Sequence, residues 1–453
     1  MNILTYFNIS IRYALITGIS VLAMQKANAQ EKIELTLKDA VSLAIKNNWE
    51  IQKAQQDVGI ASAAYNQSKA IFLPNINLSE TFITTTDPLM SFGLKLKQEI
   101  VTTQNFDPEL LNNPTRIENY ATVLKIEQPI FNPDGILAKK AAAKGKEAAE
   151  YNMSWTKSMT SFRVKTVYFN LKLGYEQQRT VLNALVAAKA NGTVAKDLYE
   201  QNLINKADLL SAELRVTELE SQVLSAENYL HNLNISLTHL LGLAHDTIIR
   251  PTDSVPLIIY AQNELQIGGI SENRNDIKAI QLQMEASNLM LKSSKSTLIP
   301  KLNAFGSYEL NDLNPFGNGA NNYTVGAKLE WDIFKGGMNL GKIQKALHQK
   351  RLTEIIYKEK ISNENRALEQ IQNDIRLAIQ KITLTEQASK QAEEVYSVRK
   401  DRFEQGMEKT SDVLQAESEM MNKKLENLQS INNYQQLVFR LEILLDKDLT
   451  SKI

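Results

Sequence analysis

Two aspartates, Asp208 and Asp412, are the best candidates for charge chemistry in this sequence, because each follows a short break between two long helical patterns. The breaks begin at Asn202 and Gly406, and a glycine at such a place supplies the freedom that a tight helix reversal needs. An acid just after the turn could line an opening and attract cations. It could equally stabilise the N-terminus of the next helix, so both interpretations stay open for each aspartate.

A nucleotide-binding motif is matched only in part. Gly336, Gly341 and Lys342 have the spacing of a phosphate-binding loop, after a strand and before a helix. The next residue is Ile343 rather than serine or threonine, so the hydroxyl that binds magnesium is missing. No second strand that ends in a metal-binding aspartate follows in a βαβ unit. The sequence therefore disfavours ATP binding.

The sequence gives no pattern typical of an enzyme or a metal site. The histidines, His231, His239, His245 and His348, lack the H-E-x-x-H motif and close ligand spacing. The chain has no cysteine, and most of its carboxylates are spread over charged helix faces. We therefore expect no catalytic residue, no metal and no cofactor.

Composition and the N-terminus predict an exported protein. The 453 residues include 51 basic and 51 acidic side chains, and this balance gives no reason to expect a nucleic-acid partner. Residues 13–24 are an apolar segment, and Ala27-Asn28-Ala29 is a small-x-small cleavage site, so 1–29 is expected to be a signal peptide. A membrane anchor is the alternative, but the segment is too short to span about 30 Å of hydrocarbon.

Three groups of residues occur twice in the same order, which indicates an internal duplication. Ile51 and Pro74 are spaced as Ile277 and Pro300 are. Farther along the chain, residues 123–131 match 326–334. In the third group, 199–201 match 403–405 and 208–213 match 412–417. The offset between the halves changes mainly between the first and second groups, so the first half carries an insertion within 84–119, which is expected to be a long polar loop.

The periodicity of apolar residues predicts the same order of elements in each half: a helix, two strands, a long helix and a returning helix. The expected first repeat is 30–242, with a helix over 37–72, strands at about 75–83 and 120–131, a long helix at about 135–201 and a returning helix at about 206–241. A linker at 243–273 follows. The second repeat is 274–446, with strands at about 301–310 and 323–334 and helices at about 338–405 and 411–445, and 447–453 is a tail.

The stretch from 323 to 405 shows how different these elements are. Residues 323–334 alternate between apolar and mostly polar, which is typical of a two-faced strand. From 338 to 405 there is no proline, and apolar residues recur in steps of three and four. A helix of that length would be roughly 100 Å long. A two-faced strand joined to so long a helix indicates that the protein meets two solvents.

Four amphipathic strands of about ten residues have the length and pattern of membrane-crossing β-strands. In lipid, an open sheet edge leaves backbone groups unpaired at several kcal/mol each. Two copies would give eight strands and a filled interior, whereas three copies would give twelve strands and a passage. The predicted fold class is therefore mainly α with a membrane β-barrel, in which a homotrimer forms a twelve-stranded barrel on an α-helical tunnel of long antiparallel coiled-coil helices.

The sequence resembles the TolC-like outer-membrane efflux channels over essentially all of its mature length. The resemblance is carried by Pro74 and Pro300 before the strands, by Gln128-Pro129-Ile130-Phe131 and Trp331-Asp332-Ile333-Phe334 after them, and by Arg402-Phe403-Glu404-Gln405-Gly406 at the second turn. It implies a homotrimer in the outer membrane, with helices extending into the periplasm. It also implies two partners, a periplasmic adaptor (membrane fusion protein) and an inner-membrane pump.

The resemblance also suggests roles for individual residues. It implies that Asp412 contributes to an acidic ring at the constricted entrance, and Gln415 stands where the family has a second acid. With Asp208, two acids per chain would still form rings of like charge.

Residues of the barrel wall are a separate set: Trp331, Tyr323 and Tyr120 are expected either at the membrane interfaces or in ordinary wall packing.

The predicted function is the outer-membrane channel of a tripartite efflux or type I secretion system. Such a channel is a passive conduit from periplasm to exterior, gated at the periplasmic helix turns. The alternative is a soluble periplasmic coiled-coil adaptor or scaffold. That alternative accounts for the signal peptide and the heptads but leaves four symmetrically placed amphipathic strands unexplained.

Overall fold

The computed structural model describes residues 32–253 and 269–447, so the expected signal peptide and most of the expected tail lie outside the described residues. The chain forms two compact units. One contains the described parts of Met1–Gln52, Lys157–Ile270 and Arg366–Ile453, and the other contains Lys53–Thr156 and Ser271–Asn365. Each unit therefore draws on both halves of the sequence.

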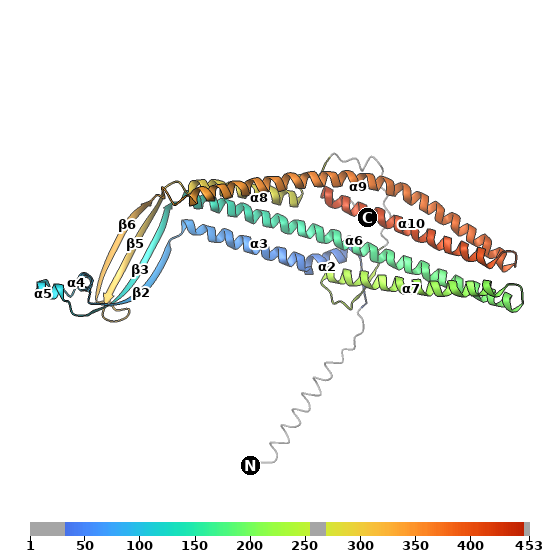
Figure 1. Cartoon of the computed structure of the whole chain (residues 1–453), viewed down its shortest axis with the longest axis horizontal. Coiled ribbons are helices and arrows are strands. Elements are labelled where there is room, and N and C mark those ends of the chain that lie inside the picture. The colour runs from blue at the N-terminus through green and yellow to red at the C-terminus, as the bar shows by residue number, and fades with distance from the viewer. Residues whose placement is uncertain (1–31, 254–268, 448–453) are drawn as a thin grey trace, which may run out of the picture. The chain divides into compact units, whose positions relative to one another are not determined.

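The second unit contains a four-stranded antiparallel sheet. Its strands are β2 (Asn75–Thr85), β3 (Ile117–Phe131), β5 (Lys301–Asp312) and β6 (Ala320–Glu330), in the order β2-β3-β5-β6 (Figure 1). Two hairpins, one from each half of the sequence, thus meet at the central β3–β5 pair. The register shifts between Pro129 and Phe131, where a proline lacks the N–H that a regular ladder uses.

The two faces of this sheet differ in polarity. Residues paired across antiparallel strands share a face, and the register aligns Leu78, Leu124, Tyr308 and Tyr323 in one row. This apolar face is exposed: Leu78 is 63% and Tyr323 is 78% accessible. The next row on the opposite face is polar and consists of Asn77, Lys125, Ser307 and Thr324.

Glu80 places a carboxylate among the apolar side chains of this face. Glu80 is paired with Thr122, and the Thr122 hydroxyl donates to its Oε2. The Phe316 N–H donates to its Oε1 at 3.2 Å. These two donors satisfy a charged group that interrupts the apolar pattern of β2.

Strand β6 ends sooner than the alternating pattern predicts. The expected strand runs to Phe334, but the last pair of the ladder joins Glu330 to Lys301, the first residue of β5. Pro300 precedes Lys301, so β5 offers no partner for residues 331–334. Trp331 instead donates its indole N–H to the Leu298 carbonyl at 2.9 Å.

The insertion between β2 and β3 is folded, which corrects the expectation of a polar loop. It contains α4 (Pro88–Lys97), the 3₁₀ turn η2 (Thr103–Phe106) and α5 (Pro108–Asn112). Asp87 and Asp107 each cap a helix whose first residue is proline, and they accept the N–H groups of Met90 and Glu109 at 2.8 and 2.9 Å. Aspartate before proline therefore begins a helix here instead of breaking one.

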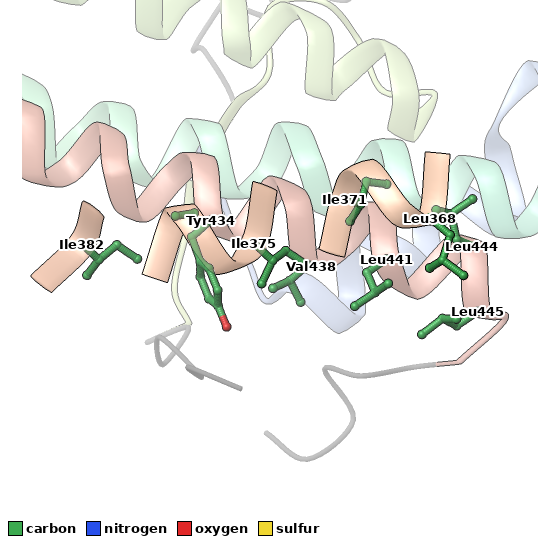
Figure 2. Packing of buried hydrophobic residues seen from close by; sticks show 10 residues of the cluster. Leu368, Ile371, Ile375, Ile382, Tyr434, Val438, Leu441, Leu444 and Leu445 are labelled. Atoms are coloured by element: carbon green, nitrogen blue, oxygen red, sulfur yellow. The ribbon is translucent and has the colours of Figure 1, made fainter. Parts of the chain in front are cut away.

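Four long helices carry most of the remaining chain: α6 (Pro133–Glu200), α7 (Lys206–Leu241), α9 (Met338–Glu404) and α10 (Thr410–Leu445). In the first unit, α9 and α10 bury a shared apolar seam (Figure 2). The seam consists of Leu368, Ile371, Ile375, Ala378, Ile382, Tyr434, Val438, Leu441, Leu444 and Leu445. Its steps of three and four are those of antiparallel helices packed along their length.

The expected first helix, 37–72, is interrupted. The structure has α2 (Leu37–Asn47), α3 (Trp49–Ser68) and the short turn η1 (Lys69–Phe72). Asn48 is extended between α2 and α3, and its side chain accepts the Glu50 N–H at 2.9 Å and donates to the Leu240 carbonyl at 2.9 Å. Asn48 thus separates the two helices and caps the start of α3 with its side chain.

The sequence analysis also missed a small parallel pair of strands. Strand β1 (Lys32–Leu35) pairs with β4 (Ile248–Pro251), which lies inside the expected linker. The Tyr168 hydroxyl donates to the Leu35 carbonyl at 2.8 Å. Burial raises the pKa of Tyr168 from 10.0 to about 12, so this phenol keeps its donor proton even at a pH where an exposed tyrosine would lose it.

Helix α8 (Asn275–Ser296) is fixed at its start by a network of charges. The fully buried Arg274 makes two bonds to Asp276, at 2.6 and 2.9 Å, and one ion pair with Glu364 at 3.0 Å. Lys360 pairs with both acids at 3.0 and 2.8 Å. The Arg274 guanidinium also lies 5.0 Å from the ring centre of Trp155, so α6, α8 and α9 meet at one satisfied cluster.

Among the described residues, no helix combines the length and the apolar character needed to cross a membrane.

Candidate functional site at the helix turns

The turn between α6 and α7 is closed by its own backbone. The N–H of Asn202 donates to the Tyr199 carbonyl and that of Leu203 to the Leu198 carbonyl, both at 2.9 Å. Asn202 has a φ of 56°, in the left-handed region that asparagine tolerates better than most residues. Asn205 then caps α7 by accepting the Asp208 N–H at 3.0 Å. The half-buried Asp208 itself stands in the first turn of α7.

The turn between α9 and α10 repeats this pattern. The N–H groups of Gly406 and Met407 donate to the carbonyls of Phe403 and Arg402, both at 2.8 Å. Gly406 has a φ of 71° and occupies the place that Asn202 has in the first turn. The two turns are therefore built alike, with glycine and asparagine as alternative solutions to one backbone requirement.

The predicted acids stand just after these turns. Asp412 is half-buried in the first turn of α10, and Gln415 is exposed one turn later. The Asp412 carbonyl accepts a bond from Arg399 at 3.3 Å, and its carboxylate accepts one from Ser411 at 3.3 Å. The roles of Asp208, Asp412 and Gln415 at an entrance stay predictions.

Glu408 in the second turn was missed by the sequence analysis. Arg402 lies 3.3 Å and Arg399 3.9 Å from its carboxylate. These contacts tie the end of α9 to the residues just before α10. The local sequence, two arginines followed by a glutamate beyond a glycine, is the signal that could have indicated this pairing.

A buried polar node, formed by Asn191, Arg215, Tyr396 and Glu417, lies in the same unit as the turns. Each side chain comes from a different helix, α6, α7, α9 and α10 in that order. Arg215 Nη2 lies 3.6 Å from Glu417 Oε1. Burial raises the pKa of Glu417 even though the Arg215 charge opposes this shift, and burial also raises the pKa of Tyr396.

The node was also missed by the sequence analysis, although the sequence contains a signal. Glu417 interrupts a buried series in α10 whose other members are Thr410, Val413 and Met421. Arg215 likewise stands between the buried Ala212 and Leu219 of α7. A charged residue at an apolar position of a helix usually has a partner of opposite charge.

The three predicted wall residues lie along the sheet. Tyr120 packs against Phe82 with ring centres 4.7 Å apart, near the end where the insertion joins β2 to β3. Trp331 is exposed just beyond the other end, after β6, and the exposed Tyr323 lies between these ends. An interfacial role for Tyr120, Tyr323 and Trp331 stays a prediction.

The partial nucleotide motif does not form a phosphate-binding loop. Gly336 and Gly337 have positive φ values, and α9 begins directly after them at Met338. Gly341 and Lys342 are therefore already inside the helix, and few free N–H groups remain to surround a phosphate. Within 32–253 and 269–447, no group of three or more histidine, aspartate or glutamate residues could hold a metal ion.

Comparison with known proteins identifies the family. The model of the outer membrane efflux protein family matches residues 40–243 and 267–445. Because this match covers most of the sequence, the chain belongs to the outer membrane efflux protein family, whose members are located in the outer membrane and act in transport. This confirms the resemblance noted above. No curated protein matches the chain.

Solved structures share the fold at low sequence identity. A membrane protein from Pseudomonas aeruginosa superposes with a TM-score of 0.76 at 16% identity, covering 92% of this chain and 93% of that one. The outer membrane protein VceC of Vibrio cholerae gives 0.73 at 18%, with coverages of 90% and 95%. The CmeC outer membrane channel of Campylobacter jejuni gives 0.73 at 17%, with coverages of 92% and 88%.

Proposed function

We propose that this chain is the outer-membrane channel of a tripartite efflux or type I secretion system. Three copies form a passive conduit from the periplasm to the exterior. The observation that carries the proposal is the two-faced sheet, which exposes a row of leucine and tyrosine side chains on one side and polar side chains on the other. An exposed apolar face suits lipid, and a polar face suits a water-filled interior.

The edges of the sheet support an assembly of several copies. Among the described strands, β2 and β6 each pair along one side only. In lipid, each unpaired backbone group costs several kcal/mol, so β2 of one copy is expected to pair with β6 of the next. Three four-stranded sheets supply twelve strands, enough to enclose a passage, whereas two would enclose only side chains.

The long helices then continue the conduit into the periplasm, and the two turns close its entrance. One structure of this fold, from Neisseria gonorrhoeae, is described as the open state of the MtrE outer membrane channel. A gated entrance therefore fits this chain. A periplasmic adaptor and an inner-membrane pump are the partners we propose, with export energy coming from the pump.

Assembly can be tested by fractionation. The full-length protein is expected in the outer membrane, and it should migrate as a trimer on unboiled gels and as a monomer after boiling. Co-purification from detergent should also recover an adaptor and a pump. A water-soluble monomer in the periplasmic fraction would contradict the proposal and favour the adaptor or scaffold alternative.

The gate can be tested by removing the candidate charges. Replacing Asp208 and Asp412 together with alanine should lower the cation selectivity of single channels in planar bilayers, because rings of carboxylates at a narrow entrance favour cations. The matched control replaces Asp197 and Asp401, which stand in the last turns of α6 and α9 and are exposed. Equal cation selectivity in both double variants and the unmodified channel would show that Asp208 and Asp412 do not line the entrance.

A further inference from the structure

The folded insertion between β2 and β3 lies against the polar face of the sheet. Five residues of that face are buried, although the rest of the face is largely accessible: Ile117, Asn119, Ala121, Asn311 and Ala320. The register places Ala121, Asn311 and Ala320 in one row across three strands. Helix α4 contacts β3 and β6, and its Ser91 and Leu94 are buried in turn, as is Gln98, which follows its last residue.

Specific polar contacts hold α4 in this position. The Gln98 side-chain amide donates to the Glu118 carbonyl at 2.7 Å and to Asn119 Oδ1 at 2.8 Å. Asn119 donates in turn to Asn311 Oδ1 at 2.9 Å. Lys97 forms an ion pair with Glu309 at 2.7 Å, and Glu309 belongs to the polar face because its partners are Val123 and Asn322.

The insertion is also rigid enough to keep a defined place. Both of its helices have aspartate caps and an initial proline. Phe92 of α4 packs edge-to-face against Phe106 of η2 with ring centres 5.6 Å apart. Thr102 and Asn105 close η2 with a reciprocal capping box. This segment is therefore a small folded structure held to one face of the sheet.

We infer that the insertion, residues 86–116, narrows the outer end of the channel as a second constriction, separate from the helix turns. The inference rests on the proposed function, in which the polar face lines the passage. Chain connectivity fixes which end is meant: α6 and α9 follow the ends of β3 and β6, whereas the insertion joins β2 to β3 at the opposite end. The turn joining β5 to β6 is much shorter, so the first half of the sequence supplies this constriction.

The absence of cysteine in the sequence makes a direct test possible. A single cysteine at Ser307, which lies on the polar face beyond the insertion, reports access from outside intact cells. In the otherwise unmodified channel, Ser307→Cys should react with a small charged maleimide but be protected from a maleimide that carries a polyethylene glycol chain. Replacing 86–116 with the β5–β6 turn sequence, 313–319, should accelerate the bulky reaction several-fold.

Two control cysteines define the limits of this assay. Asn318→Cys lies in the exposed β5–β6 turn and should react with both reagents in every background. Tyr308→Cys lies on the apolar face next to Ser307 and should react with neither. Together they separate a narrow exit from poor surface expression.

A milder change covers the case in which the shortened chain does not assemble. Lys97→Glu with Gln98→Ala removes the contacts to Glu309, Glu118 and Asn119 but keeps the insertion. It should also speed the bulky labelling of Ser307→Cys. Lys95→Glu makes the same charge reversal on the same helix and should leave the labelling unchanged.

The outcomes distinguish this inference from the proposed function. Equal bulky labelling of Ser307→Cys with and without the insertion would overturn the constriction and leave the channel intact. A Ser307→Cys that reacts with neither reagent in any background, while Asn318→Cys reacts with both, would show that the polar face does not line a passage. That result would overturn the proposed function itself.

Discussion

At the scale of single residues, the node around Glu417 is the most unusual feature of the helical part. A fully buried carboxylate and a largely buried arginine lie 3.6 Å apart where four helices meet. Charges in such a place are costly to bury, and removing one partner leaves the other unpaired. The node is therefore a point at which the relative register of α7 and α10 is sensitive to mutation.

Replacing Arg215 with alanine should destabilise the helical region by about 3–5 kcal/mol, because Glu417 would remain buried without its counter-charge. Thermal unfolding followed by circular dichroism in detergent should show a clearly lower midpoint. Arg179→Ala is the control, because Arg179 is exposed and its ion pair with Glu176 is long, at 3.9 Å. Surface pairs of that kind contribute about 0–1 kcal/mol. An equal drop of the thermal midpoint in the two variants would therefore contradict a special dependence of Glu417 on Arg215.

The node also makes stability depend on pH. The pKa of Glu417 in the folded protein is raised above its ordinary value of 4.5, so the folded state holds this proton more tightly than the unfolded state does. The stability contributed by Glu417 is therefore fully present below 4.5 and is lost as pH rises through the folded pKa.

The measurement compares the unmodified protein with Glu417→Gln, which cannot titrate at this position. As pH falls from neutral toward 4.5, the thermal midpoint of the unmodified protein should rise relative to that of the variant. A difference between the two midpoints that stays constant over this range would rule out titration of Glu417 as a source of pH dependence.

At the scale of elements, the helix turns depend on one residue each. Gly406→Ala should destabilise the protein by about 1–2 kcal/mol, because alanine resists the left-handed conformation. A Cβ at this glycine would meet no atom within 4 Å, so the cost arises from the backbone alone. Gly406→Asn should cost less, since Asn202 fills the equivalent place in the first turn.

Gly341→Ala is a control, because it should change the stability in the opposite direction from Gly406→Ala. Gly341 lies within α9, and a Cβ there also meets no atom within 4 Å. Gly341→Ala should therefore stabilise the protein by up to about 1 kcal/mol, the difference in helix propensity. Thermal midpoints of the two alanine variants that shift in the same direction would argue against this account of the turn.

The elements also show what the sequence can and cannot predict. The long helices and the amphipathic strands have enough residues for a period to be recognised, and the chain indeed forms α9 over Met338–Glu404. β1 has only four residues and too little pattern to detect. Residues 331–334 continue the alternation, but the partner strand stops, and only the structure reveals a missing partner.

The helix turns and the buried node differ in the same way in how far the sequence indicates them. The turns could be located because Asn202 and Gly406 interrupt long helical patterns. The node could not, because Asn191, Arg215, Tyr396 and Glu417 are distant in sequence and are brought together only by the packing of four helices. The folded insertion was missed because aspartate before proline usually indicates a turn or loop.

At the scale of the whole molecule, the two faces of the sheet predict different tolerance to charge. Val325 is 77% accessible on the apolar face, and its neighbour Thr324 lies on the polar face. Val325→Arg should reduce the amount of trimer in the outer membrane, since arginine facing lipid costs about 2–4 kcal/mol near the middle of the bilayer. Thr324→Arg should be tolerated. Equal yields of both variants on unboiled gels would contradict a lipid-facing apolar surface.

The central pairing of β3 with β5 has a consequence for biogenesis. Asn119 and Asn311, which bond across this pair, are 192 residues apart in sequence. The early hairpin of β2 and β3 therefore emerges from the export machinery long before its main partner does. Contacts so distant in sequence form slowly and leave unpaired strands prone to aggregation. Newly secreted chains should consequently rely on periplasmic chaperones until the second hairpin arrives.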